Sequence, residues 1–253
     1  AEKFTVFAEG LNIATSLTFA NDGVIVAMAP HFLFLKDTDG DGVADTRDTL
    51  MTGWGKFDTH AGPSNLQYGF DNRIWGVVGF SGFNGYINGQ RQVFGQGLYR
   101  FRPDGTEFEY LATTSNNTWG LGMSEDNNVF LSTANNTHSA FYSMPERLMQ
   151  RRLTSAGRPD VYAVQKIDGH YEVHALTPNL RQVDVVGGFT SAAGHQLYTA
   201  RDYPQAFWNR AAFVAEPTVR LIHHAVIAPD GAGFKEQDGW NFAASSDEWF
   251  GPI

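Results

Sequence analysis

Leu17-Thr18-Phe19-Ala20-Asn21-Asp22-Gly23-Val24 is a short pattern that returns along the chain. Two apolar residues stand two positions apart, a turn opens at an aspartate three residues later, and an apolar strand follows. The arrangement recurs in residues 66–74 and 121–129, and more loosely in residues 189–199. Because Asp-Gly and Asp-Asn pairs tolerate the positive φ of tight turns, each copy predicts a β-hairpin.

A second kind of hairpin is expected between these copies. Residues 98–110, 161–173 and 221–234 each place an Asp-Gly pair between two apolar-rich runs. Two hairpins make a four-stranded blade, and units of about 50–70 residues fit a propeller with long loops. A β-sandwich is the alternative, but it requires no alternation of two hairpin types. We therefore predict an all-β protein built as a β-propeller.

Four such units are visible, and we expect residues 1–253 to form a single propeller domain. Either the four blades close into a ring, or the chain is a fragment of a larger ring without its last blades. In the second case a further chain or fragment would complete the propeller, because unpaired edge strands invite association. A short surface helix is expected at residues 144–153, which have a proline near their start and no β-branched residue.

The composition agrees with many short strands, since 14% of the 253 residues are aromatic and 27 are glycine. The net charge of −9 disfavours a nucleic-acid partner, because an acidic surface repels phosphates, and it favours metal cations. The absence of cysteine excludes a disulfide framework, a thiolate metal site and a covalently attached c-type haem within the chain.

No stretch of the sequence approaches the roughly 18 consecutive apolar residues of a membrane-spanning helix, so no membrane span is expected. The first residues, Ala1-Glu2-Lys3-Phe4, read as the mature end left after a signal peptide is removed, although a trimmed chain would look the same. We therefore expect a periplasmic or secreted protein.

An acidic loop in the first unit has the spacing of a calcium-binding loop. Calcium takes six to eight oxygen ligands, and the EF-hand spacing supplies them from positions 1, 3, 5, 7, 9 and 12 around a glycine at position 6, here Gly42. The expected ligands are Asp37, Asp39, Asp41, the Val43 carbonyl, Asp45 and Asp48. Strand-like flanks make the loop resemble the calcium loops of dockerin, thrombospondin and integrin-type repeats. We expect one structural calcium ion.

His60 lies in a Gly-Pro-containing segment, residues 57–66, directly before one of the repeated hairpins. Loops that lead into the inner strands of a propeller open on its central channel. A histidine there, close to a carboxylate, could act as a general base near neutral pH. The alternative is a histidine whose hydrogen bonds are satisfied by the backbone of the turn, and spacing leaves both readings open.

Several of these motifs resemble known proteins. Residues 60–62 and 66–79 resemble a segment of the quinoprotein glucose and sorbosone dehydrogenases, six-bladed propellers that use pyrroloquinoline quinone (PQQ) and calcium. Residues 116–121 resemble their cofactor turn, and residues 191–204 resemble the segment before their last blade. The sequence is still more similar to the proteins described as membrane-bound dehydrogenases of planctomycete-type bacteria, in which four such strings occur in the same order.

The resemblance implies a PQQ-dependent dehydrogenase of a sugar-like substrate, with cytochrome c as a candidate electron acceptor. His60 would take a hydroxyl proton while hydride passes to PQQ. The resemblance also implies that Asn117 and Trp119 bind the cofactor. We place His195 with them, although it stands where the sugar dehydrogenases carry an apolar residue.

Two other functions stay open on the sequence alone, because propellers host all three. One is a calcium-dependent hydrolase or lactonase, whose metal would need carboxylate and amide ligands such as Glu216, Asn117 and Asp184. The other is a non-catalytic propeller that binds carbohydrate or protein. Reconstitution with PQQ would separate the first function from the other two.

Overall fold

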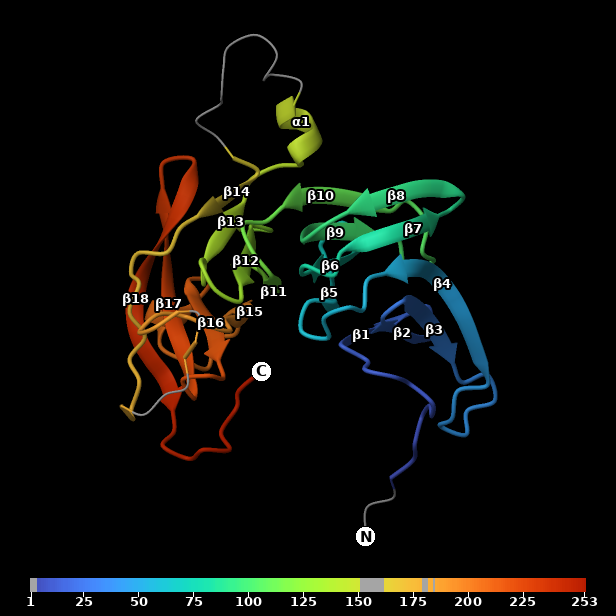
Figure 1. Ribbon diagram of the computed structural model, residues 1–253, viewed down its shortest axis with the longest axis horizontal. Coiled ribbons are helices and arrows are strands. Elements are labelled where there is room, and N and C mark those ends of the chain that lie inside the picture. The colour runs from blue at the N-terminus through green and yellow to red at the C-terminus, as the bar shows by residue number, and fades with distance from the viewer. Residues whose placement is uncertain (1–3, 151–161, 179–181, 184) are drawn as a thin grey trace. The chain divides into compact units, whose positions relative to one another are not determined.

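The computed structural model describes residues 4–150, 162–178, 182–183 and 185–253. Almost all of its regular structure consists of antiparallel strands in four sheets, which confirms the prediction of an all-β, propeller-type fold (Figure 1). Within the described part of the chain, no helix is long and apolar enough to cross a membrane.

The strands of the first two sheets alternate along the chain. The hairpin β7–β8 lies between β6 and β9 in the sequence, but it pairs with β4 and extends the first sheet. The first sheet has the order β1-β2-β3-β4-β7-β8 and the second β10-β9-β6-β5. Their bounds are β1 Ser16–Ala20, β2 Gly23–Met28, β3 His31–Lys36, β4 Thr46–Trp54, β5 Pro63–Tyr68, β6 Ile74–Val78, β7 Phe83–Ile87, β8 Gln90–Phe94, β9 Gly97–Phe101 and β10 Glu109–Thr113.

The other two sheets each join consecutive strands, in the orders β11-β12-β13-β14 and β15-β16-β17-β18. Their bounds are β11 Thr118–Met123, β12 Val129–Thr133, β13 Ala140–Tyr142, β14 Val164–Lys166, β15 Ala193–Leu197, β16 Ala211–Glu216, β17 Leu221–Asp230 and β18 Gly233–Ala244. The helix α1 (Glu146–Gln150) lies within the predicted range, and a 3-10 helix covers Gln205–Phe207. The rest of the predicted helix falls outside the described residues.

The predicted hairpins of the first kind are present at β1–β2, β5–β6 and β11–β12. Their turns use the positive φ that the sequence suggested, as at Asn21, Asp22 and Asn127. The looser copy gives β15, the first strand of the fourth sheet, but the next strand starts only at residue 211.

The hairpins of the second kind are confirmed at β9–β10 and β17–β18, whereas the one predicted at residues 161–173 is wrong. There the short strand β14 pairs with β13, and the chain leaves the sheet at Asp168-Gly169. Tertiary partners override the local turn preference, because the Asp168 carboxylate accepts the Ser139 N–H and the Gly169 N–H binds Glu236.

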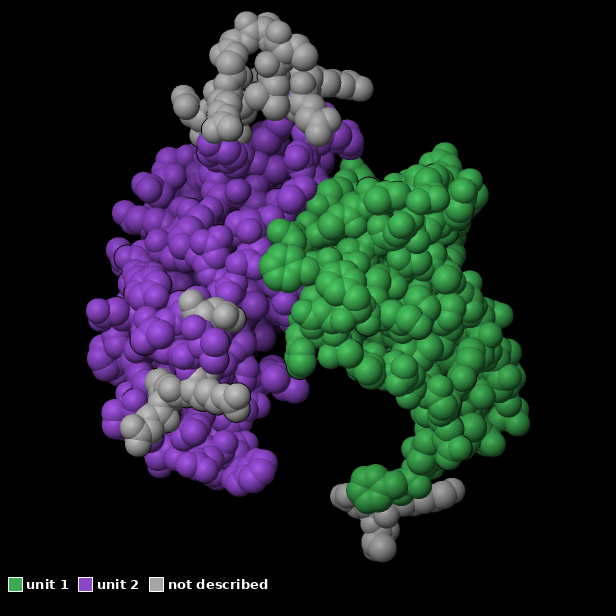
Figure 2. Space-filling view, in the orientation of Figure 1, with its two compact units in different colours: residues 1–110 green, residues 111–253 purple. Residues whose placement is uncertain are grey.

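The chain divides into two compact units, residues 1–110 and 111–253 (Figure 2). Each unit has its own apolar core. In the first, Phe32 stacks on Trp54 with ring centroids 4.6 Å apart, and both side chains are almost fully buried. In the second, Phe130 packs with Phe141 and Leu197. The single propeller domain and its possible closure into a ring stay predictions.

The aromatic core of the first unit gives a stability prediction. Phe32→Ala removes a ring that is 0% exposed and leaves a cavity beside Trp54, so the free energy of unfolding should fall by about 3–5 kcal/mol. Phe57→Ala removes the same ring from a position that is 77% exposed and should change it by less than about 0.5 kcal/mol. Urea unfolding followed by circular dichroism measures both, and equal losses would contradict this description of the core.

Candidate functional site

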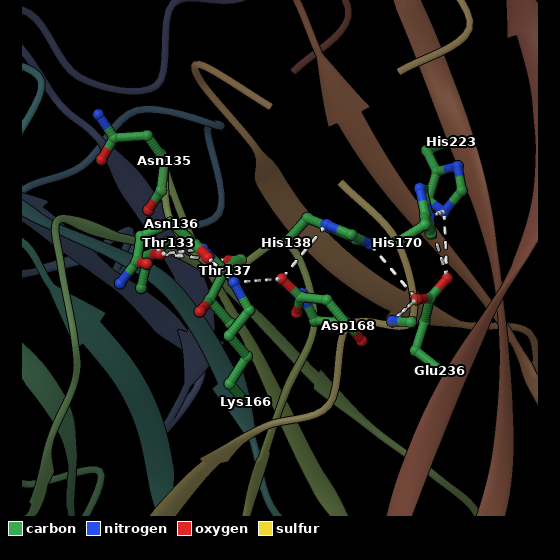
Figure 3. Close-up of polar contacts among 12 residues, drawn as sticks. Thr133, Asn135, Asn136, Thr137, His138, Lys166, Asp168, His170, His223 and Glu236 are labelled. Carbon is green, nitrogen blue, oxygen red and sulfur yellow. Dashed lines mark hydrogen bonds and ion pairs between the residues drawn. The ribbon is translucent and has the colours of Figure 1, made fainter. Parts of the chain in front are cut away.

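Three histidines and one glutamate converge inside the second unit, drawn from four separate stretches of the chain (Figure 3). His138 follows β12 and His170 follows β14, while His223 lies on β17 and Glu236 on β18. Each offers one donor atom, and all four donor atoms lie within 4.8 Å of one another. A set of three imidazoles and a carboxylate at this spacing could hold a metal ion.

The two strand residues reach the site through the alternation of the β17–β18 hairpin. Residues 221–228 of β17 alternate between buried and half-buried, and His223 lies on the buried face with Leu221 and Ala225. Glu236 is the one fully buried residue of β18, with 2% exposure. A carboxylate is rarely buried without a partner, so its position is a functional signal.

The two loop residues are fixed by backbone hydrogen bonds. The Ser139 N–H donates to Asp168 Oδ1 over 2.9 Å, which ties the His138 loop to the segment that carries His170. The Gly169 N–H donates to Glu236 Oε2 over 2.6 Å. A Cβ at Gly169 would come within 2.2 Å of the Glu236 carbonyl oxygen, so this approach requires glycine.

Glu236 is the centre of the cluster. Its Oε1 lies 3.4 Å from His170 Nε2 and 3.5 Å from His223 Nε2, and its Oε2 lies 3.5 Å from His138 Nε2. The Nε2 atoms of His170 and His223 are 3.3 Å apart. All three imidazoles therefore turn Nε2 toward the same carboxylate.

Electrostatics keep this carboxylate ionised. Burial alone would raise the pKa of Glu236, but the three imidazoles and the Gly169 N–H hold it far below its ordinary value. Burial lowers the pKa of His223 and favours its neutral form. For His170, burial also acts to lower the pKa, but Glu236 and Asp238 outweigh it and the pKa is raised.

A pocket of about 610 Å³ opens beside the cluster, and His138 and His170 form part of its wall. Phe189 stacks on His138 with ring centroids 4.0 Å apart and closes one side. The remaining lining residues are Asn116, Asn135, Asn136, Thr137, Lys166, Asp168, Tyr171 and Val185. A concave site with convergent polar groups is the usual form of a small-molecule site.

Two of the predicted cofactor residues are close in the sequence to a residue that lines this pocket. Asn117 is buried and its carbonyl accepts the Ala134 N–H, while its neighbour Asn116 lines the pocket. Trp119 is half-buried on β11. Cofactor binding by Asn117 and Trp119 stays a prediction.

His195 lies on β15 in the second unit. Its side chain is 0% exposed, its Nε2 meets Ser139 Oγ at 2.7 Å, and its ring stacks on Phe130. Burial lowers the pKa of His195 to about 3, so the imidazole is neutral at physiological pH. In this position His195 supports the Ser139 segment, and its predicted contact with a cofactor stays a prediction.

The predicted base His60 lies in the first unit, before β5. Its side chain is 89% exposed, and its Nδ1 lies 3.6 Å from Asp58 Oδ1. The carboxylate that a base would use is therefore present, but the catalytic role of His60 stays a prediction. The alternative lactonase ligands stay a prediction: the Glu216 carboxylate accepts the Thr190 and Ser191 N–H groups, and Asp184 falls outside the described residues.

The acidic loop connects β3 to β4, as its strand-like flanks predicted. Of the six expected ligands, the structure gathers the carboxylates of Asp37, Asp39 and Asp45 within 4.8 Å of one another. Asp48 lies within β4 opposite Phe34, and Asp41 Oδ1 accepts the Val43 N–H, so the full set of six ligands stays a prediction. N–H groups of Gly42 and Gly40 lower the pKa of Asp37.

The sequence reasoning missed the His138–Glu236 cluster because its four members share no local motif. A signal was present in β17, where His223 occupies an apolar position of an alternating strand. Nothing local marks His138 or His170, since only the tertiary structure brings these loops together.

The family comparison covers the whole chain. The profile of a family described as "Domain of unknown function (DUF7133)" matches residues 1–253. The chain belongs to this DUF7133 family. No curated protein matches the DUF7133 chain.

Solved structures are similar to the DUF7133 chain at low identity. A luciferin-regenerating enzyme is 8% identical with a TM-score of 0.50, over 84% of this chain and 58% of its own. The PQQ-bound aldose sugar dehydrogenase of Streptomyces coelicolor is 15% identical with a TM-score of 0.47, over 87% and 64%. A gluconolactonase of Xanthomonas campestris is 12% identical with a TM-score of 0.43, over 87% and 60%. The chain thus spans about three fifths of these proteins, and the likeness concerns the fold.

The acidic loop gives a test of its ligand set. Asp39→Asn keeps the side-chain oxygen that accepts the Asp41 N–H but removes a charge from the cluster of three, so it should weaken calcium binding. Asp48→Asn, the matched control, should leave calcium binding unchanged, whereas the six-ligand loop predicts that both variants weaken it. Calorimetric calcium titration and thermal melts with and without EDTA measure the effect. No calcium binding by the unaltered protein would contradict the site.

Proposed function

We propose that this DUF7133 chain forms the substrate site of an enzyme that converts a sugar or a sugar derivative. The pocket beside His138 and His170 carries the proposal. Its volume of about 610 Å³ lies in the range of small-molecule sites. Oxidation of a sugar hydroxyl is the first reaction to test, and hydrolysis of a sugar lactone is the second.

The chemistry of the pocket wall suits a neutral, polyhydroxylated ligand. The side chains of Asn116 and Asn135 can donate to or accept from sugar hydroxyls. Tyr171 is 61% exposed and offers an aromatic face to the C–H groups of a sugar ring. Lys166 lies 3.3 Å from Asp168, so the charges of this pair offset each other.

The same wall bears on the identity of the cofactor. PQQ carries several carboxylates, and Lys166 is the one lysine or arginine among the described residues of the pocket wall. If PQQ binds to this chain, we expect it beside Asn117, Trp119 and His195, the residues that the sequence motifs favour. The His138–Glu236 donors beside the pocket favour the lactonase reading, since metal ions activate water for hydrolysis.

The wider setting of the enzyme is also part of the proposal. Because the chain spans about three fifths of its structural neighbours, a further chain or fragment would complete the propeller. Cytochrome c as electron acceptor and a periplasmic or secreted location stay predictions that accompany the dehydrogenase reading.

A matched pair of tyrosine variants tests the pocket. Tyr171→Ala removes an aromatic face from the wall, so KM for the accepted sugar should rise about tenfold, the equivalent of about 1.4 kcal/mol. Tyr86→Ala removes an equally exposed ring from β7 and should leave KM unchanged. The assay uses aldoses with a dye acceptor, with and without PQQ, and sugar lactones with a pH indicator.

The outcomes separate the three functions. Turnover that requires PQQ and is lost in His60→Ala supports the quinoprotein dehydrogenase. Lactone hydrolysis without PQQ supports the lactonase. Sugar binding without turnover would contradict catalysis and leave a carbohydrate-binding propeller. Equal KM values for Tyr171→Ala and the unaltered protein would show that this pocket does not bind the sugar.

A further inference from the structure

We propose that His138, His170, His223 and Glu236 bind one divalent ion of a first-row transition metal, such as zinc or cobalt. The inference goes beyond the proposed function and does not depend on it, because a metal in this site would be bound whether or not the pocket turns over a sugar. It also concerns a site separate from the acidic loop, which lies in the first unit.

The spacing of the four donors is that of a coordination shell. Nitrogen and oxygen donors bind such ions at about 2.0–2.2 Å, so neighbouring donors are separated by about 3.0–3.6 Å at angles between octahedral and tetrahedral. The separations between Glu236 and the three Nε2 atoms are 3.4–3.5 Å, and two of the Nε2 atoms are 3.3 Å apart. Donors at these separations can share one cation, and all four donor atoms lie within 4.8 Å of one another.

A network of protonated histidines is the competing explanation, and the same distances disfavour it. Charge-assisted hydrogen bonds between nitrogen and a carboxylate are about 2.7–2.9 Å long, clearly shorter than these contacts. His138 is 2% exposed, and its Nε2 makes no hydrogen bond within the described part of the chain. Leaving a buried polar nitrogen without a partner costs free energy, which a metal bond would remove.

Oxygen atoms also lie on the outer, Nδ1 side of each imidazole, and the one at His170 is within hydrogen-bond distance. Ligating histidines direct one nitrogen to the metal and the other to an oxygen, which fixes the ring and its tautomer. His170 Nδ1 lies 2.9 Å from the Glu172 carbonyl oxygen. His138 Nδ1 lies 3.5 Å from Asp168 Oδ2, and His223 Nδ1 lies 4.0 Å from Asp238 Oδ1.

Charge and ligand type select the class of ion. The carboxylate of Glu236 lies in a buried region, where a divalent cation would compensate its charge. Imidazole donors suit zinc, iron, cobalt, nickel and copper, whereas calcium and magnesium prefer shells made of oxygen. The cluster and the acidic loop should therefore take different metals.

The experiment measures metal binding directly. The full chain is stripped with a chelator and titrated with Zn²⁺ and with Co²⁺, and bound metal is counted by elemental analysis. We expect one tightly bound ion, a rise in the melting temperature, and cobalt absorption bands more intense than those of the hydrated ion. His170→Ala and Glu236→Gln should each weaken binding by more than roughly 100-fold, and Asp168→Asn, which changes the outer contact of His138 and the anchor of the Ser139 N–H, by about 10–100-fold.

Matched controls lie outside the cluster. His31→Ala removes a histidine from β3, and Glu125→Gln alters a carboxylate paired with Arg201, so both should bind metal like the unaltered protein. If His170→Ala does not fold, the nearly isosteric Glu236→Gln variant and the cobalt spectrum of the unaltered protein still test the metal site. A cobalt spectrum identical to that of the hydrated ion, or equal affinity in Glu236→Gln and Glu125→Gln, would overturn the proposal. Neither result depends on turnover, so failure of the proposed function is detected separately.

Discussion

The buried carboxylate of Glu236 is the constraint around which the second unit is organised. An uncompensated carboxylate inside a protein costs several kcal/mol, so the chain must bring positive or hydrogen-bonding groups to it. The Gly169 N–H donates to it and three imidazole Nε2 atoms lie 3.4–3.5 Å from it, and these groups come from three further segments of the chain. A segment that supplies one of these groups is thereby fixed in place, which explains why residues 167–170 leave the sheet instead of closing a hairpin.

The β-sheets supply the rigid frame that this arrangement needs. β17 and β18 pair in register from Leu221 to Asp230, with bulges near His223, and the pairing of Ile227 with Glu236 sets the position of the carboxylate. β11 approaches β15 so closely that a Cβ at Gly122 would lie 1.8 Å from the His195 carbonyl oxygen. His195 then bonds Ser139, whose N–H binds Asp168. The pocket wall is therefore held by strands on one side and by a chain of polar contacts on the other.

The sequence predicts the parts of the fold that depend on local chemistry. Asn21 and Asp22 adopt the positive φ of a tight turn, and Asp230-Gly231 closes the last hairpin, because these preferences act within a few residues. The inserted hairpin β7–β8 was not predicted, since its pairing with β4 is a tertiary contact. The hairpin predicted at Asp168-Gly169 is absent for the same reason. The Asp168 carboxylate and the Gly169 N–H bind residues that are distant in the sequence, and these contacts outweigh the local turn preference. The strands on both sides of the acidic loop were predicted from their residues and are present. Asp48 was included among the calcium ligands because of its spacing alone, and it lies within β4.

The candidate site was harder to predict than the fold because its residues are 13 to 98 positions apart, the separations of His223 from Glu236 and of His138 from Glu236. Single histidines in loops carry no signal until the fold brings them together.

The most direct test of the metal site is a crystal structure of the zinc-loaded protein with diffraction data collected at the zinc absorption edge. The account predicts an anomalous peak between the Nε2 atoms of the three histidines and the Glu236 carboxylate. An empty cluster, with zinc bound only at the acidic loop, would contradict it.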